Sequence, residues 1–429
     1  MSNDQPVNYG SQLFDVMNAV SDKVGGVEYL IGLSLRDPKS SNIPLLAGDA
    51  QKALGDKLDA FLLGNEPDLY SRHGNRPNMA NYTVNDYIGD FASVLQSGWF
   101  DQFDDHLKYI TLQHYPQDNC KGTHRFELIY YLQHSNAVDL AQWQMNGIQV
   151  LKSSPNPKPL IMDEFSSASC GGVPGISDTF GAAMWSVDYA LQLATVGYSA
   201  AYLHIRERGI TYNLFDPPDA PAGGAGAWTT NPSFYAYFPI SEALQAKSGS
   251  RVVDLNIQNS MKDVNQSVAG YAVYDASSSN VHSVVLFNFA NATGGSVEFS
   301  LPASFFPSGG DITVRYLTAP NVNEKTQISW GNQTYAGVGD GLAVISTAPS
   351  VVADKVVSCS SGCNIQVPGP AIAVVFVGGT PTLDPAPSAS PSSTSPTGAT
   401  KTKNSALPSL QIPLSSWVIV LTFLFTILI

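Results

Sequence analysis

The first half of the chain alternates short apolar segments, typical of strands, with segments of helical pattern. Helical patterns at 87–96, 126–132 and 178–196 separate most of the apolar segments. Strands that alternate with helices in this way form parallel βα units. Residues 1–247 are therefore expected to form a (β/α)8 barrel of the TIM type. We count five strands of this barrel, at 26–35, 60–63, 109–114, 160–162 and 200–205.

The second half of the chain has a different pattern. Segments such as 283–289 and 371–377 follow a period of two residues, and turn residues are frequent between such segments. This period is typical of antiparallel strands. Residues 248–380 are therefore expected to form a C-terminal antiparallel β-sandwich.

Two glutamates stand at the ends of expected strands. Glu66 lies in the sequence FLLGNEPD (61–68), and Glu164 lies in LIMDEFSS (160–167). The active face of a (β/α)8 barrel lies at the carboxyl ends of its strands, so both carboxyls are expected over one pocket. Such a pair is typical of a glycosidase, in which one carboxyl protonates the leaving oxygen and the other attacks the anomeric carbon.

A single glutamate at a strand end is more often solvated or paired with a basic residue than catalytic. The neighbours of Glu66 favour the catalytic interpretation. Gly64 allows close backbone approach, Asn65 places an amide beside the carboxylate, and Pro67 ends the strand because it has no backbone N–H. Glu164 is less distinctive alone, and its interpretation depends on the pairing with Glu66.

The charge of the chain excludes one class of partner. The formal net charge is −13 and the pI is about 4.8. No basic stripe is present to neutralise phosphates, so we expect no nucleic-acid partner. The same charge opposes the binding of a sulfated polymer in a basic cleft. It suits a secreted acidic hydrolase that stays soluble.

The four cysteines predict two disulfides in an oxidising compartment. Cys120 and Cys170 each follow an expected strand, so a bond between them would join two loops of the active face. Cys359 and Cys363 are four positions apart and would close a small loop between two strands. No cluster of His or Cys accompanies either pair, so we expect no metal site.

The C-terminal end of the sequence predicts attachment to a membrane. Residues 381–404 are rich in Pro, Ser and Thr, as in an O-glycosylated stalk. Within 405–429, small residues and a short spacer precede an apolar stretch of 16 residues, 414–429. A spanning helix needs about 20 residues. We therefore expect a GPI-attachment signal, with the ω residue among 404–406, in preference to a tail anchor.

Other features indicate the secretory pathway. Four sequons predict N-glycosylation, at Asn81, Asn265, Asn291 and Asn332. Residues 1–18 lack the basic start, apolar run and cleavage site of a signal peptide. We therefore expect further sequence upstream of Met1 and an extracellular protein, either GPI-anchored at the cell surface or secreted.

Four motifs occur in a specific order over about 20–380. They are Gly64-Asn65-Glu66-Pro67, Gln113-His114-Tyr115, Glu164-Phe-Ser-Ser-Ala168 with Gly171-Gly172, and Ser177-Asp178-Thr179-Phe180. In these motifs the chain resembles fungal members of glycoside hydrolase family 79, the β-glucuronidase and heparanase family. The resemblance implies a (β/α)8 barrel followed by a β-sandwich, in agreement with the pattern of the sequence.

The resemblance also implies roles for single residues. Glu66, on the fourth barrel strand, would be the acid/base, and Glu164, on the seventh, would be the nucleophile. Asn65 would contact the 2-hydroxyl of the sugar. Tyr115, on the sixth strand, would position or tune Glu164, and His114 would line the sugar subsite. Ordinary packing at a strand end is the alternative for His114 and Tyr115.

The loop after the nucleophile is implied to hold the carboxylate of a uronic acid. Ser169, Gly171 and Gly172 would bind it through a hydroxyl and backbone amides, since glycines permit the exposed N–H groups of an anion-binding concavity. Animal heparanases carry Tyr at the position of Ser169, so this chain departs from them there. Arg206 and Arg208 are possible charge partners, although structural ion pairs are the more common role for such residues.

The resemblance further implies that parts of the barrel are missing. The first strand-like segment is similar to the third strand of the family barrel, and no fifth strand separates the helical patterns around 94–99. We therefore expect an incomplete barrel. We also expect that expression from Met1 gives aggregated or inactive protein.

Together these features predict a retaining exo-β-glycosidase that needs no cofactor and acts as a monomer. Its expected substrate is a glycan of the cell surface or of plants with a terminal glucuronic acid or 4-O-methylglucuronic acid. Two alternatives remain. A retaining β-glycosidase for a neutral sugar would use the same glutamates. A non-catalytic GPI-anchored surface protein that binds cell walls would need neither.

Overall fold

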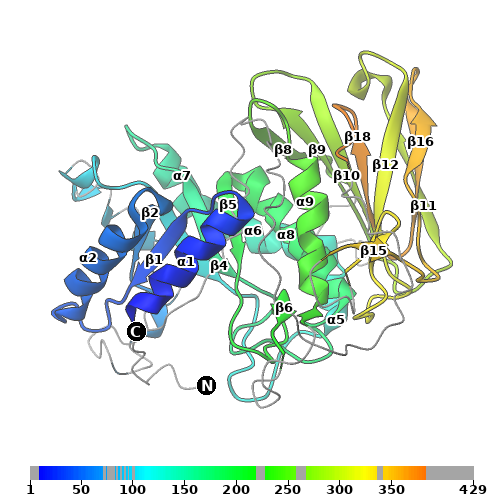
Figure 1. Ribbon diagram of the computed structural model, residues 1–429. Coiled ribbons are helices and arrows are strands. Elements are labelled where there is room, and N and C mark those ends of the chain that lie inside the picture. The colour runs from blue at the N-terminus through cyan, green and yellow to red at the C-terminus, as the bar shows by residue number, and fades with distance from the viewer. Residues whose placement is uncertain are drawn as a thin grey trace, which may run out of the picture.

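The computed structural model describes residues 9–70, 102–218, 228–257, 267–335 and 342–382, together with single positions between 74 and 98. Figure 1 shows an α/β part that contains the N-terminal elements beside a part built of β-strands. Several predictions fall wholly or largely outside the described residues. These are the helix at 87–96, the missing fifth strand near 94–99, the sequons at Asn81 and Asn265, the stalk and the GPI signal.

The five strands expected in the first half are all present. Strand β1 (Tyr29–Leu33) pairs in parallel with β2 (Leu58–Leu63). A second parallel sheet has the order β3-β4-β5, formed by Ile110–His114, Leu160–Phe165 and Tyr198–Leu203. The alternation of strands and helices therefore predicted parallel βα units correctly.

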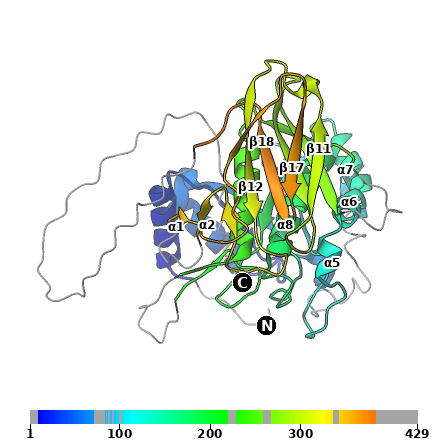
Figure 2. The same cartoon turned by 90° about the vertical axis from the view of Figure 1, so that its right-hand side faces the viewer.

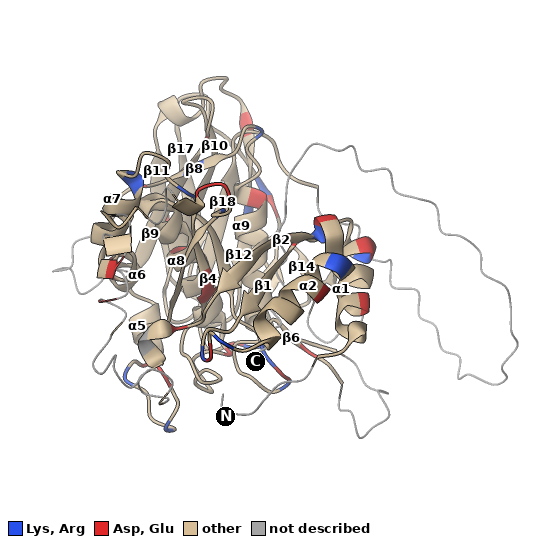
Figure 3. Cartoon of the chain, turned by 90° about the vertical axis from the view of Figure 1, so that its left-hand side faces the viewer, with Lys and Arg blue, Asp and Glu red and all other residues tan. Residues whose placement is uncertain are grey.

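Helices cover the outer faces of both parallel sheets. Helices α1 (Ser11–Val24) and α2 (Asn42–Leu54) pack on β1 and β2 through a shared apolar core. Figure 3 shows acidic and basic residues intermixed on these two helices. The helices that follow β3 and β4 pack on the second sheet. They are α5 (Leu128–Tyr131), α6 (His134–Gln142), α7 (Met145–Lys152) and α8 (Phe180–Val196).

The two parallel sheets share one apolar interior. Leu30 of β1, Leu62 of β2 and Ile161 of β4 form a single buried cluster, and Ala200 of β5 packs against it. Side chains from separate parallel sheets thus meet inside a ring of helices, as in a (β/α)8 barrel. The described residues hold five of the parallel strands that a closed barrel needs. The fold expected from the sequence is confirmed.

The second half forms an antiparallel β-sandwich, seen face-on in Figure 2. After a short hairpin, β6 (Phe215–Asp216) and β7 (Thr229–Thr230), helix α9 (Tyr237–Ala243) leads into it. The larger sheet has the order β15-β14-β13-β12-β18-β10-β9-β8, and β16 also pairs with β12. The smaller sheet is β11-β17. The bounds are Ser250–Asp254, Val268–Asp275, Val281–Asn288, Ser296–Leu301, Asp311–Thr318, Ser329–Trp330, Gln333–Thr334, Val344–Ile345, Lys355–Ser358, Cys363–Pro368 and Ala371–Phe376 for β8 to β18.

The central strands of the larger sheet do not alternate in burial, in contrast to the period expected from the sequence. Every residue of β18 is buried, and seven of the eight residues of β10 are buried. One face of this sheet packs on α8 and the other on β11 and β17. A sheet covered on both faces has apolar side chains on both, so its strands are continuous apolar runs. Alternation is clear in β11 and β17 of the smaller sheet.

A buried polar cluster joins α6 and α8 to the sandwich. His134 is fully buried, and its Nδ1 lies 2.9 Å from Oδ1 of Asp188 in α8. Its Nε2 lies 3.5 Å from Oδ2 of Asp254 in β8, and the hydroxyl of Tyr271 in β9 donates to Asp188. Burial by itself lowers the pKa of His134, but the charges of the two aspartates and the hydrogen bonds to them outweigh it and raise the pKa to about 10.

We expect the protonated form of His134 to stabilise the fold. The folded-state pKa of about 10 lies above the usual value of about 6.5. This contribution is therefore complete below pH 6.5 and is lost as the pH rises through 10. His134→Gln should lower the free energy of unfolding by about 3–5 kcal/mol at pH 6. Chemical denaturation at several pH values measures this. His106→Gln, at an exposed position, is the control, and equal losses in the two variants would contradict the prediction.

Candidate active site

The end of β2 turns sharply at the Gly64-Asn65-Glu66-Pro67 motif. Gly64 has φ 86° and Glu66 has φ 40°, both in the left-handed region. A Cβ at Gly64 would lie 3.1 Å from the hydroxyl of Tyr70, which accepts a hydrogen bond from the Asn65 N–H. Pro67 then begins a short 3-10 turn, Pro67–Leu69. A left-handed glutamate costs about 1–2 kcal/mol, and such local strain is typical of functional sites.

A β-bulge in β4 brings two successive carboxyls to one face. Leu112 of β3 pairs with Met162, but the next residue, Gln113, pairs with Glu164, so Asp163 is an extra residue in β4. The pairing with β5 is irregular at the same place. Without the bulge, neighbouring side chains would point to opposite faces. Instead Asp163 and Glu164 both contact side chains of the barrel interior, and both are buried.

Glu164 is held by residues from two neighbouring strands. The hydroxyl of Tyr115, just after β3, donates to Oε1 of Glu164 at 2.5 Å. Nδ1 of His204, just after β5, lies 3.5 Å from the same oxygen. Burial, followed by the charge of Glu164, raises the pKa of Tyr115 well above its usual value, and the charge of Glu66 adds to the shift. Tyr115 therefore stays protonated and acts as a donor near both glutamates.

Gln113 connects the end of β2 to this group. Its Oε1 accepts a hydrogen bond from the N–H of Glu66 at 2.7 Å, and its Nε2 donates to Oδ1 of Asn65 at 2.6 Å. Nε2 also lies 3.4 Å from Oδ2 of Asp163. Gln113 thus places Asn65 and Glu66 at the same edge as Glu164.

Three of these residues were not predicted from the sequence as site residues: Gln113, Asp163 and His204. Gln113 was noted only within a motif, although it stands two positions before Tyr115 on the same face of β3. Asp163 was missed because its side chain should have pointed to the opposite face from Glu164. His204 follows β5 at the active edge, and that position at the end of a barrel strand was the signal that could have identified it.

His114 lies on the other face of β3. Its ring packs on Trp143, with 4.9 Å between the ring centroids, and burial lowers its pKa to about 4. Ile110 and Leu112 of the same strand also belong to the core on the helix side. The two-residue period of β3 therefore directs His114 away from Gln113 and Tyr115. This corrects the expectation that His114 lines the sugar subsite.

The loop after β4 is fixed on both sides. Ser169 donates its N–H to the carbonyl of Gln117 at 2.9 Å, and Nδ2 of Asn119 donates to the carbonyl of Gly172 at 2.8 Å. On the other side, the N–H and the hydroxyl of Thr211 both donate to the carbonyl of Gly171.

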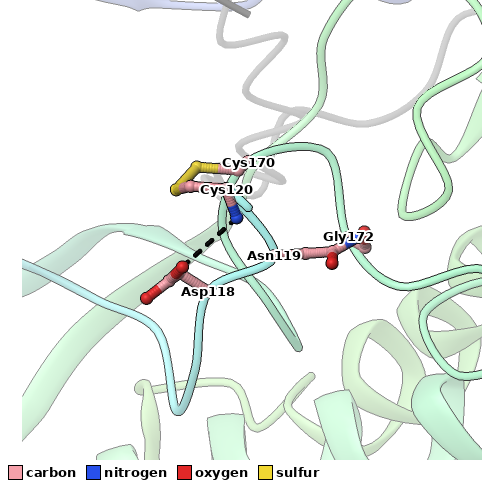
Figure 4. The surroundings of a disulfide bond; sticks show 5 residues. All are labelled: Asp118, Asn119, Cys120, Cys170 and Gly172. Carbon is pink, nitrogen blue, oxygen red and sulfur yellow. Dashed lines mark hydrogen bonds between the residues drawn. A yellow bond between two sulfur atoms is a disulfide. The ribbon is translucent and has the colours of Figure 1, made fainter. Parts of the chain in front are cut away.

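Two disulfides join the four cysteines. Cys120 and Cys170 are bonded, which ties the loop after β3 to the loop after β4 (Figure 4). Cys359 and Cys363 are also bonded and close the turn before β17.

Three successive residues of the loop after β4 are left-handed. Cys170, Gly171 and Gly172 have φ of 58°, 94° and 75°. The N–H of Gly171 interacts with the hydroxyl of Tyr212, while no acceptor is found within the described part of the chain for the N–H groups of Cys170 and Gly172. Successive N–H groups of this kind form anion-binding concavities. A Cβ at Gly172 would lie 2.2 Å from Oγ1 of Thr211, so this position requires glycine.

The remaining predicted positions lie apart from these contacts. Arg206 forms an ion pair with its neighbour Glu207, with 3.2 Å between Nε and Oε2. Arg208 follows in the same loop after β5. Of the four sequons, Asn291 and Asn332 lie in turns of the sandwich.

The chain is similar to known glycosidases. Residues 270–374 match the glycosyl hydrolase family 79 C-terminal beta domain. The chain is 26% identical over 370 residues to a beta-glucuronidase of Aspergillus niger, a match that covers 72% of this chain and 65% of the relative. It is 24% identical over 379 residues to a beta-glucuronidase of Neurospora crassa, covering 68% and 64%. The chain thus spans just under two thirds of the length of these relatives.

One solved structure supports the same fold. It is a 4-O-alpha-L-rhamnosyl-beta-D-glucuronidase from Fusarium oxysporum, with a TM-score of 0.64 and 19% identity. The match covers 87% of this chain and 81% of that structure. The matched C-terminal domain, the shared fold and the motifs at Glu66 and Glu164 all support the resemblance of this chain to glycoside hydrolase family 79.

Proposed function

We propose that this protein is a retaining exo-β-glucuronidase, in which Glu164 is the nucleophile and Glu66 is the acid/base. The observation that carries the proposal is that residues of strand β3 and the position just after it hold both Glu66 and Glu164. Gln113 fixes the backbone of Glu66, while Tyr115, two residues later, fixes the carboxylate of Glu164. Two carboxyls brought to one edge of the barrel in this way suit a double-displacement mechanism.

The contacts of Glu164 indicate which of its oxygens attacks. Within the described residues, both the Tyr115 hydroxyl and the His204 ring approach Oε1. Oε2 is therefore the oxygen that forms the bond to the anomeric carbon, while Glu66 gives its proton to the departing oxygen. In the second step Glu66 takes a proton from water, the water oxygen bonds to the anomeric carbon, and Glu164 leaves as a carboxylate.

The proposed substrate carries a terminal glucuronic acid or 4-O-methylglucuronic acid. Two relatives named beta-glucuronidase support this choice. The N–H groups of Cys170 and Gly172 offer a site for the carboxylate of the sugar. A carboxylate held by backbone N–H groups needs no basic side chain, in agreement with the net charge of −13.

We also propose that the protein acts outside the cell, as a monomer held by a GPI anchor. The sequence of 405–429 and the sequons at Asn291 and Asn332 support this proposal. Two disulfides, which persist in oxidising compartments, support it as well. None of the helices in the described ranges has the length and apolar character needed to cross a bilayer.

Paired chromogenic substrates test the proposed specificity. The glucuronide should be preferred over the glucoside by about a hundredfold or more in kcat/KM, because a neutral sugar leaves the N–H groups unpaired. Gly172→Ala should remove this preference, because its Cβ would meet Thr211. Gly175→Ala is the matched control, since Gly175 is also left-handed but has open space around it.

The other outcomes identify the alternatives. Comparable rates on glucuronide and glucoside would contradict the proposed substrate and favour a β-glycosidase for a neutral sugar. Turnover of neither substrate by the folded chain would favour a surface protein without catalytic activity.

A further inference from the structure

The second carboxyl at the bulge, Asp163, has no part in the double displacement described above. It is 2% exposed, and the side chains that donate to it among the described residues are on β3. Oδ2 lies 3.4 Å from Nε2 of Gln113, and the hydroxyl of Thr111 also interacts with the carboxyl. Oδ1 is buried and has no hydrogen-bond partner in the described part of the chain. A buried carboxylate with so few donors is costly.

We propose that Asp163 is a positioning residue which, as the uncharged acid, keeps Gln113 in place and thereby holds Asn65 and Glu66 opposite Glu164. The inference rests on the proposed glycosidase function. Gln113 is the only described side chain that contacts all three segments: the turn after β2, β3 itself and the bulge in β4. A movement of the Gln113 amide therefore also moves Glu66, the proposed catalytic acid.

The surroundings assign the proton of the Asp163–Glu164 pair to Asp163. Glu164 receives a hydrogen bond from Tyr115 and has the ring of His204 beside it, and hydrogen-bond donors favour a carboxylate. Asp163 interacts with its own backbone N–H, the Thr111 hydroxyl and, over the longer distance of 3.4 Å, the amide of Gln113. Burial, followed by the negative charge of Glu164, raises the pKa of Asp163 to about 7.

Ionisation of Asp163 would disturb the site. Two successive buried carboxylates repel each other. The new charge would draw Nε2 of Gln113 from 3.4 Å into close contact and so weaken its bond to Asn65. Because the other end of the same amide holds the N–H of Glu66, the acid would move as well. A displacement of about 1 Å can cost on the order of a hundredfold in rate.

The titratable and charged groups around this pair come from the other strands and the loops that follow them: Glu66 after β2, Tyr115 after β3, and His204, Arg206 and Tyr212 after β5. Arg206 and Tyr212 keep their charge state near pH 7, because the pKa of an arginine is far higher and burial raises that of Tyr212. Burial lowers the pKa of His204, so this ring is neutral when Asp163 ionises. Tyr115 remains a phenol throughout. Among these groups, Asp163 is thus the one whose pKa is raised into the range between pH 6 and 8.

The pH profile of kcat/KM tests the proposal. The wild-type enzyme should lose activity as the pH rises through about 7, because the active form contains uncharged Asp163. Asp163→Asn keeps the shape and is neutral at every pH, so the alkaline limb should move up by about one pH unit or more. Asp56→Asn, at an exposed position, should leave the limb in place.

If Glu66 alone set the alkaline limb, Asp163→Asn would give a different result. Removal of a nearby negative charge lowers the pKa of an acid, so the limb would stay or move down. Either outcome overturns the proposal. Gln113→Glu is a second variant of the same size. It retains the acceptor for the Glu66 N–H but lacks the donor for Asn65 and Asp163, so it should lower kcat without a comparable change in KM.

Infrared difference spectroscopy provides a readout that does not depend on turnover. The wild-type chain at pH 6 should show one protonated-carboxyl band that disappears near pH 7 and is absent from Asp163→Asn, separate from the band of protonated Glu66, which both chains share. An enzyme that hydrolyses the glucuronide but lacks this band overturns the role of Asp163 and leaves the proposed function intact. A folded chain that hydrolyses no glycoside overturns the proposed function, and the role of Asp163 with it.

Discussion

Replacing Glu164 by Gln is expected to lower kcat by about 10⁴-fold or more on every glycoside. The amide cannot form the glycosyl-enzyme, and loss of a covalent nucleophile has effects of this order in other hydrolases. The fold should be retained, because an amide oxygen at this position still accepts from the Tyr115 hydroxyl. Steady-state kinetics with an aryl glucuronide measures the loss, and the thermal unfolding midpoint checks the fold.

The matched control is Glu127→Gln, which changes an exposed glutamate in the same way and should leave kcat unaltered. Activity of Glu164→Gln within tenfold of the wild type would exclude Glu164 as the nucleophile. Equal loss in both variants would point to a general effect on folding.

Replacing Glu66 by Ala is expected to have an effect that depends on the leaving group. General acid catalysis contributes about 10²–10⁴-fold, so natural glycosides should lose rate in that range. An aryl glucuronide with a good leaving group needs little protonation and should form the glycosyl-enzyme almost normally. Azide should then restore turnover, since it attacks the intermediate without a general base and yields the β-glycosyl azide.

Rates with a series of aryl glucuronides, with and without azide, measure this effect. A uniform loss on every substrate, with no rescue by azide, is incompatible with Glu66 as the acid/base. Glu28→Ala changes a glutamate before β1 and serves as the control for the loss of an acidic side chain.

The sequence was sufficient to predict the parallel strands and the two glutamates at their ends. Both depend on local features: a short apolar run defines a strand, and the residue after it lies at the active edge. The orientation of Glu164, in contrast, depends on the bulge at Asp163. That bulge is decided by how β4 pairs with β3 and β5, and the sequence of β4 alone does not reveal it.

Two further differences between the sequence-based expectation and the structure also depend on how distant parts of the chain are arranged. Gln113, His114 and Tyr115 are adjacent in one motif, yet the pleat of β3 separates His114 from the other two. The apolar runs of β10 and β18 were interpreted as one-sided strands, because nothing in their sequence states that α8 covers the second face. Burial by a distant element is a property of the whole fold.

The position of α8 has a consequence for where the molecule can be divided. This helix runs from the loop after the bulge to β5, so it carries the chain from Glu164 to His204. Phe180, Met184 and Val187 of this helix pack in one core with strands of the sandwich. The boundary near residue 247 is therefore a boundary in the sequence and not in the apolar core. A protease that removed the sandwich would leave the helix behind Glu164 with a water-exposed apolar side, so a replacement sandwich would have to be introduced together with a matching face of this helix.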